Sequence, residues 1–213
     1  MWYRTSTMFC LKVPSDPTWA SFAEGSLAAI LADHAHCEMK AATNAMSLAA
    51  RHPQDLVIVR ALVDLAREEL DHFSRVVDFL EARGIVLGPP DVDTYAAKLR
   101  AEIGKLPPSP FPRNAGLVDR LLVAALIEAR SCERFRLLLD RLDRTREAAL
   151  AAFYEELFAV EARHYTDMVD LAVRAAGGAH ERSRVVERLE LLSVQEGRIV
   201  RELAAEARAT IHG

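Results

Sequence analysis

The chain has 213 residues, a length that suits one domain with a sizeable core. Its formal net charge of −4 excludes a globally basic protein, so any contact with nucleic acid or membrane would need a local patch. The three cysteines, Cys10, Cys37 and Cys132, stand at unrelated spacings and exclude a disulfide framework. These features predict a reduced, cytoplasmic protein, and the first residues carry no pattern of a secretory signal.

Hydrophobic periodicity predicts helices throughout the chain and no strand. In chain order, the predicted helices cover residues 15 to about 51, 56–84, 94–104, 115–142, the turn at 143–147 to about 176, and 184 to about 210. Ser15 or Asp16 is expected to cap the first helix, Gly84 to end the second, and Thr145 to cap the fourth long helix.

The segment "KLPPSPFPRN" (105–114) holds four prolines and cannot be helical. It therefore predicts one long crossover between two helical hairpins. The expected fold is all-α, a four-helix bundle with one long connection and an extra C-terminal helix, in a single domain over residues 1–213.

Each of the four long helices carries an apolar seam with steps of three and four residues, and one glutamate interrupts each seam near its middle. On two helices a histidine follows that glutamate three residues later. The six residues are Glu38, Glu69, His72, Glu128, Glu161 and His164.

Buried carboxylates that lie close together repel one another unless a positive charge stands between them. A pair of divalent cations meets this need. One Glu from each of two helices and Glu-x-x-His from each of the other two is the ligand set of ferritin-like di-iron and di-manganese bundles. Oxygen and imidazole ligands suit Fe, Mn or Zn, so the six residues are the predicted metal ligands. A satisfied polar core without metal is the alternative.

Counting from the turns predicts that these glutamates lie level in their hairpins. Glu38 precedes Pro53 by 15 residues, and Glu69 follows it by 16. Glu128 and Glu161 stand at similar separations from Arg144. Glu133, the rival on the third long helix, would lie roughly 9 Å off in height at a rise of 1.5 Å per residue. The counting therefore favours Glu128.

Other polar residues carry weaker predictions. His34, one turn before Glu38 on the same face, is interpreted as a partly buried, hydrogen-bonded histidine, with a position behind the metal ligands or in a pocket wall as the alternative. Glu196 is interpreted as a residue at the border of the apolar side of the last helix, and not as a fifth carboxylate ligand. Two groups of basic residues are candidates for gripping phosphates, with a mixed solvated surface as the alternative. They are Arg130, Arg134, Arg136, Arg141, Arg144 and Arg146 on the third long helix and its turn, and Lys98, Arg100, Lys105 and Arg113 around the crossover.

Four strings together resemble the MiaE family of tRNA hydroxylases. They are "HAHCEMKAA" (34–42), "REELDHF" (67–73), "IEARSCERF" (127–135) and "EARHY" (161–165), within a resemblance that spans about residues 15 to 205. Members are non-haem di-iron monooxygenases on a ferritin-like fold that hydroxylate the isopentenyl group of 2-methylthio-N6-isopentenyladenosine in tRNA. The six predicted ligands match the iron ligands of that family one by one.

The resemblance implies two iron ions, with Mn or another divalent metal as a substitute, together with O₂ and an external electron donor. It implies a tRNA substrate bound near its anticodon and a redox partner. No apolar run reaches the ~18 residues of a membrane span, so no membrane partner is expected, and both a monomer and a dimer fit the sequence. It also makes the arginine-rich third helix the candidate RNA surface. The alternatives are a ferritin-like iron-handling protein, an oxygenase of a small hydrophobic substrate, and a metal-free interaction module.

Overall fold

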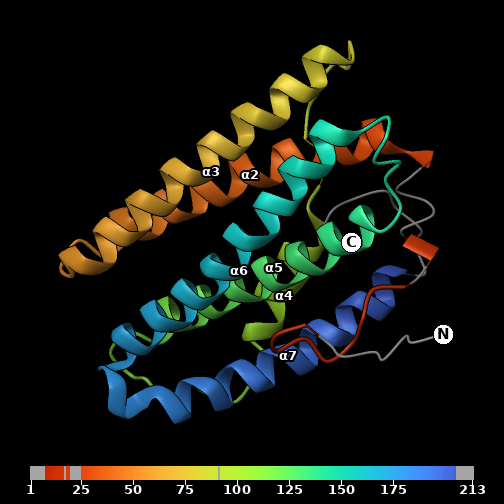
Figure 1. Ribbon diagram of the computed structural model, residues 1–213. Helices are drawn as coiled ribbons and strands as arrows, with labels where there is room; N and C mark the ends of the chain where they lie inside the picture. The colour runs from red at the N-terminus through yellow and green to blue at the C-terminus, as the bar shows by residue number, and fades with distance from the viewer. Residues whose placement is uncertain (1–7, 17, 20–24, 91, 205–213) are drawn as a thin grey trace. The chain divides into compact units, whose positions relative to one another are not determined.

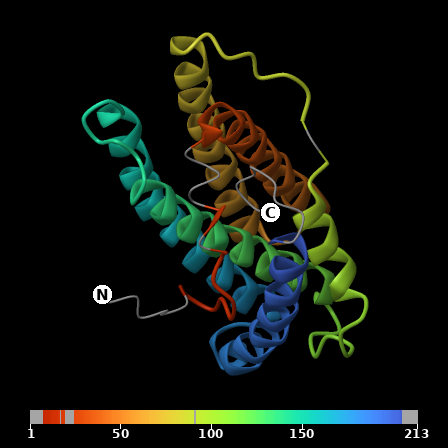
Figure 2. The same cartoon turned by 90° about the vertical axis from the view of Figure 1, so that its right-hand side faces the viewer.

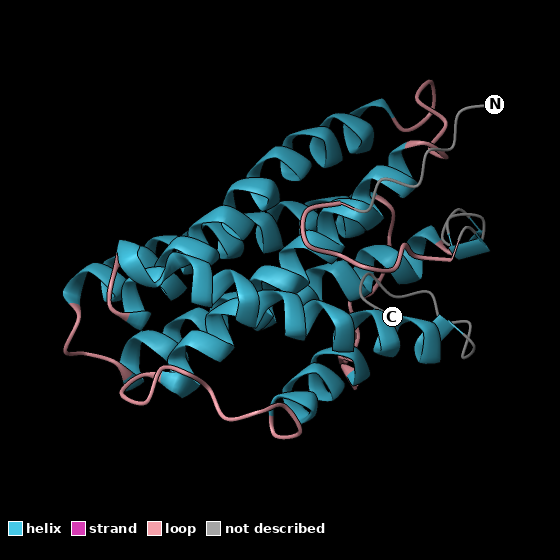
Figure 3. Ribbon diagram, turned by 90° about the horizontal axis from the view of Figure 1, so that it is seen from below, coloured by secondary structure: helices cyan, strands magenta, loops and turns pink. Residues whose placement is uncertain are grey.

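The computed structural model describes residues 8–16, 18–19, 25–90 and 92–204. These residues form helices and connecting loops, and no strand occurs among them (Figure 3). They divide into two compact units: residues 25–92 with α2 and α3, called the α2–α3 unit, and residues 8–19 and 93–204 with α4 to α7, called the α4–α7 unit.

The α2–α3 unit is an antiparallel hairpin of α2 (Leu27–Arg51) and α3 (Leu56–Ala82), which lie side by side (Figure 1). Asp55 caps α3, because its carboxylate accepts the N–H groups of Val57 at 3.0 Å and of Ile58 at 3.2 Å. Gly84 ends it as predicted, with a φ of 63° that glycine adopts without strain.

The α4–α7 unit contains a second antiparallel hairpin, formed by α5 (Ala115–Leu139) and α6 (Ala148–Ala176). The short helix α4 (Thr94–Ile103) precedes the crossover, as the sequence predicted. After the one-turn 3-10 helix η1 (Ala179–Glu181), helix α7 (Arg182–Ala204) packs beside α4 and α5 (Figure 2). The predicted end of this last helix near residue 210 lies outside the described residues.

The seams of the long helices are buried as the periodicity predicted, with small shifts. On α6, the seam that the pattern predicts is buried throughout: Leu150, Tyr154, Leu157, Glu161, His164, Met168 and Leu171. On α2 the pattern predicts Ala41 in the seam, but its neighbour Ala42 is the buried residue. On α3 it predicts Leu65, and Ala66 is buried instead. Ala41 and Ala42 lie three and four residues after Glu38, so either one lies on the face that Glu38 occupies, and the buried stripe turns only slightly.

Three predicted helix limits were wrong. The first predicted helix is interrupted at Ser26, and α2 begins at Leu27 rather than near residue 15. Helix α5 ends at Leu139 rather than at residue 142, and Leu138 accepts the N–H groups of Arg141 and Leu142, both at 3.0 Å, in a closing turn. Thr145 does not cap α6. Instead Asp143 accepts both the N–H and the hydroxyl of Thr145, at 3.0 and 2.6 Å, because a short carboxylate readily bonds the backbone two residues on.

Buried arginines connect the parts of the α4–α7 unit. Arg188 of α7 makes a two-point ion pair with Asp119 of α5, at 2.8 and 2.9 Å, and both residues are buried. The same guanidinium donates to the carbonyl of Pro107 at 2.8 Å. Arg184 donates to the carbonyl of Pro110 at 3.0 Å. The proline-rich crossover is therefore held against the start of α7 at two carbonyls.

Candidate metal centre

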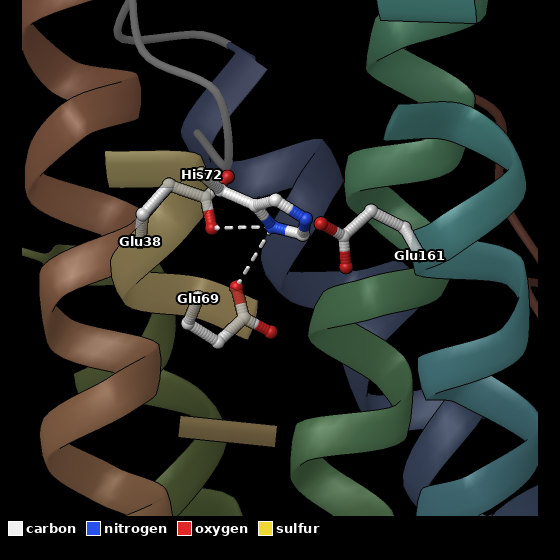
Figure 4. A group of neighbouring side chains, drawn as sticks. All are labelled: Glu38, Glu69, His72 and Glu161. Carbon is white, nitrogen blue, oxygen red and sulfur yellow. Dashed lines mark ion pairs between the residues drawn. The ribbon is translucent and has the colours of Figure 1, made fainter. Parts of the chain in front are cut away.

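The α2–α3 unit buries two carboxylates and one imidazole together: Glu38 from α2, and Glu69 and His72 from α3. Nδ1 of His72 lies 3.6 Å from Oε2 of Glu38 and 3.4 Å from Oε2 of Glu69 (Figure 4). One possible ligand atom from each of the three residues falls within 4.8 Å of the others. The hairpin therefore brings the predicted pair of glutamates level, as counting from its turn required.

His34 stands next to this group on α2. Its Nε2 atom lies 2.6 Å from Oε1 of Glu38, and its side chain is 1% exposed. His34 is hydrogen-bonded as interpreted, but it is fully rather than partly buried, and its partner Glu38 is one of the predicted ligands, which agrees with the alternative of a position behind the ligands. A buried imidazole that donates to a carboxylate orients that carboxylate and fixes which oxygen faces away.

The α4–α7 unit buries a matching group: Glu128 from α5, and Glu161 and His164 from α6. Nδ1 of His164 lies 3.1 Å from Oε2 of Glu161. One possible ligand atom from each of these three residues also falls within 4.8 Å of the others. Each unit thus supplies two carboxylates and one imidazole.

The pKa of the Cys132 thiol responds to the negative charge of this second group. Burial raises its pKa, and the negative charges of Glu161 and Glu128 raise it further. Its Sγ atom contacts the carbonyl of Phe158 at 3.6 Å, and the side chain is fully buried. The surroundings of Glu128 and Glu161 therefore favour cations and disfavour any additional negative charge.

The donor set fits a divalent cation. In each unit two buried carboxylates lie close to one buried imidazole, and they leave an excess of negative charge that a cation would neutralise. Hard oxygen donors with imidazole nitrogen suit iron and manganese, and no thiolate belongs to either group. The structure therefore supports metal binding by carboxylate and histidine side chains.

Glu133, the rival to Glu128, is engaged elsewhere in the α4–α7 unit. It accepts the backbone N–H of Ser15 at 3.0 Å and the hydroxyl of Ser15 at 2.7 Å, and it pairs with Arg130. Arg130 also donates to Glu196 of α7, at 2.9 Å from Nε and 2.6 Å from Nη2. Glu133 thus belongs to an ion-pair network that holds the N-terminal segment against α5.

Two sequence interpretations were wrong in this network. Glu196 is no border residue: it is fully buried, and it accepts a hydrogen bond from the hydroxyl of Tyr95 at 2.9 Å as well as from Arg130. Arg130 and Arg134 are also buried, and Arg134 lies over the ring of Trp19 at 4.3 Å. These two arginines therefore cannot contribute to the predicted RNA surface on the third long helix.

Comparison with known proteins identifies the family. A family model described as tRNA-(MS[2]IO[6]A)-hydroxylase (MiaE) matches residues 4–212. The chain belongs to the MiaE family. The resemblance seen in the four sequence strings is thereby confirmed.

Two curated proteins support this membership. A tRNA 2-(methylsulfanyl)-N(6)-isopentenyladenosine(37) hydroxylase of Pseudomonas putida is 39% identical over 162 residues, which cover 76% of this chain and 74% of that protein. A hydroxylase of the same name from Salmonella typhimurium is 38% identical over 115 residues, or 54% of this chain and 39% of that protein.

Among solved structures, this MiaE-family chain is similar to a protein from Synechococcus described as Protein 43 with aldehyde deformylating oxygenase activity. The TM-score is 0.78 at 34% identity, over 97% of this chain and 96% of that one. The predicted fold class is confirmed: all-α, of the ferritin-like bundle type with one long crossover and an extra C-terminal helix. In the part of the chain that the structure describes, no helix has the length and apolarity that crossing a membrane requires.

Sequence reasoning missed the roles of Arg130, Glu196 and Tyr95. The signal for Arg130 was its position one turn after Leu126, a buried apolar residue of α5. No spacing rule pointed to its partner, because Glu196 lies 66 residues away.

Proposed function

We propose that the chain is a di-iron, O₂-dependent monooxygenase that hydroxylates the isopentenyl group of 2-methylthio-N6-isopentenyladenosine in tRNA. The observation that carries the proposal is the pair of buried carboxylate–histidine groups in a chain of the MiaE family. Both relatives are named as hydroxylases of this nucleoside, which supports the substrate.

The proposal includes one metal centre built from both groups, in one domain over residues 1–213. Its ligands are the six predicted residues: Glu38, Glu69, His72, Glu128, Glu161 and His164. The equal donor sets of the two units support this arrangement, because a carboxylate-bridged pair of ions needs two sets of oxygen and imidazole ligands.

In this function, bound iron would supply the activation of O₂ with electrons from an external donor. The chain's own residues hold the ions and exclude water. The carboxylates balance the charge of the cations, and His34 orients Glu38 through its 2.6 Å contact. Leu157 and Met168, one turn to either side of the Glu161–His164 pair on α6, are buried and keep that group dry.

The same proposal covers the partners and the place of action. The substrate is tRNA, bound near its anticodon, and a redox partner supplies the electrons. The enzyme acts in the cytoplasm as a monomer or dimer, with iron as the metal and manganese as a possible substitute.

The direct test measures the nucleoside. Iron-loaded protein with a reductant and O₂ is incubated with tRNA that carries the prenylated nucleoside, and digested nucleosides are analysed by mass spectrometry. We expect a gain of one oxygen atom on the prenyl group. A strain without this protein that still makes the hydroxylated nucleoside would contradict the proposal.

A second candidate is an oxygenase of a small hydrophobic substrate such as an aldehyde. The similarity to the Synechococcus protein, at 34% identity, favours it over an iron-storage protein. Incubation of the loaded protein with a long-chain aldehyde separates the two: turnover of the aldehyde without any change in tRNA would support the second candidate.

A further inference from the structure

The crossover between α4 and α5 is a firmly held surface segment. Pro107, Pro108 and Pro112 are exposed, while Phe111 is buried beneath the guanidinium of Arg184, whose Cζ lies 5.5 Å from the ring centroid. Hydrogen bonds from Arg188 and Arg184 hold the carbonyls of Pro107 and Pro110. Side chains at the ends of this segment therefore start from a fixed backbone.

Exposed cations surround this segment. We define the crossover patch as four exposed residues on α4, the crossover and the start of α5: Arg100, Lys105, Arg113 and Arg120. Arg100, Arg113 and Arg120 form no ion pair with any residue in the described part of the chain. Arg113 lies in the turn just before α5, and Arg120 lies in the second turn of that helix, so both are close to its start.

Few negative charges oppose this patch. From residue 98 to residue 120 the chain holds only two carboxylates, Glu102 and Asp119. Asp119 is buried against Arg188, and Glu102 pairs with Lys105. Because no described carboxylate pairs with Arg100, Arg113 or Arg120, these three arginines keep their full charge at the surface.

The rival basic group lies at the turn between α5 and α6, and ion pairs neutralise two of its exposed arginines. Arg144 pairs with Glu155 at 2.5 Å, and Arg146 lies 3.5 Å from Asp143. Asp140 and Glu147 are interleaved with the remaining exposed arginines, which are Arg136 and Arg141. With Arg130 and Arg134 buried, this turn has a mixed charge, whereas the crossover patch has one sign.

The crossover patch also lies close to the predicted metal ligand on α5. Arg120 precedes the predicted ligand Glu128 by eight residues on the same helix, about 12 Å at a rise of 1.5 Å per residue. A nucleotide that has left its stack can bridge such a distance, with its phosphate at the surface and its modified base directed inward.

We propose that the crossover patch binds the phosphate backbone of the tRNA substrate. The proposal rests on the proposed function and adds to it the surface that holds the RNA. Arg113 and Arg120 contact phosphates through charge-assisted hydrogen bonds. Arg100 and Lys105 extend the positive potential along the RNA backbone.

The test compares two double variants of equal charge. Arg113→Gln with Arg120→Gln removes two cations of the patch, and Arg136→Gln with Arg141→Gln removes two exposed cations near the other end of α5. The association constant K for prenylated tRNA is measured between 50 and 300 mM salt. Log K falls as log[salt] rises, and each lost phosphate contact makes this negative slope shallower by about 1.

We expect the slope of the patch variant to be shallower by about 2 and its affinity to fall at least about tenfold. The control variant should match the wild type in both. Equal slopes for all three proteins, or an equal loss in both variants, would overturn the proposal. Iron content and thermal unfolding are measured in parallel, and all four arginines are exposed, so folding should be unaffected.

Two further outcomes separate this proposal from the proposed function. If the wild type hydroxylates tRNA and the patch variant binds it as the wild type does, only the crossover patch is wrong. If the wild type neither binds nor hydroxylates tRNA, the proposed function fails as well. Loss of binding to phosphatidylglycerol vesicles, with tRNA binding intact, would make the patch a lipid-binding surface and overturn the proposal.

Discussion

His34 and Glu38 form a buried contact one turn apart on α2, with 2.6 Å between Nε2 and Oε1. The imidazole occupies one oxygen of the carboxylate, so the other oxygen, Oε2, faces His72 at 3.6 Å. His34, which is not one of the six predicted ligands, thus orients the carboxylate of Glu38, which is one of them.

His34→Ala should weaken metal binding by about 10- to 100-fold, because Glu38 loses the donor that holds it in place. His34→Gln, whose amide can donate to the same oxygen, should retain more affinity than His34→Ala. Titration against a competing chelator measures the affinity in each variant. Equal affinities for wild type and His34→Ala would show that Glu38 is held by other contacts.

Loss of a ligand should remove the metal and leave the helices folded. His164→Ala and Glu128→Ala should each lower bound iron after reconstitution and abolish hydroxylation. Glu133→Gln is the matched control on α5, because Glu133 interacts with Ser15 and Arg130. Metal analysis and circular dichroism give the result. Iron lost in Glu133→Gln but kept in Glu128→Ala would disprove the choice based on height.

The buried ion pair of Arg188 and Asp119 should be important for stability. Asp119→Ala leaves an uncompensated guanidinium at a buried position, which should lower the free energy of unfolding by about 3–5 kcal/mol. The exposed pair of Arg182 and Asp170, at 2.6 Å, is the control. Asp170→Ala should cost less than about 1 kcal/mol. Denaturant unfolding of both variants measures the difference, and similar losses in the two would contradict the assignment.

Gly197 marks the close approach of α7 to the N-terminal segment. A Cβ atom added there would lie 2.7 Å from Cγ2 of Val13, so Gly197→Ala should destabilise the protein by about 1–3 kcal/mol despite the better helix propensity of alanine. Val13→Ala in the same chain should recover part of this loss.

Gly116→Ala is the control for helix propensity, because nothing lies within 4 Å of an added Cβ atom at that position in α5. It should stabilise the protein by about 0.5–1 kcal/mol. Denaturant unfolding measures the free energy of unfolding of the wild type, Gly197→Ala, Val13→Ala, the double variant and the Gly116→Ala control. A stabilising effect of Gly197→Ala would mean that the N-terminal segment is free to move away from α7.

The sequence by itself determined the helices, their seams and the six candidate ligands. Glu69 and His72 share a face because they are three residues apart, and counting from the turn at Pro53 set Glu38 beside them. These relations are local: they depend on helical rise, period and the length of a hairpin, which a sequence displays directly.

Only the tertiary structure decided which charged residues are buried and with whom. Arg130, Glu133 and Glu196 look like surface residues by type, yet they form one network across α5, α7 and the N-terminal segment. Both basic groups were candidates along the chain, and burial or ion pairing engages four of the six arginines of one group, whereas Arg100, Arg113 and Arg120 of the crossover patch form no ion pair within the described residues. The physical reason is that ion pairs depend on distance in the folded chain, and the spacing of residues in the sequence does not show which residues 66 positions apart become neighbours.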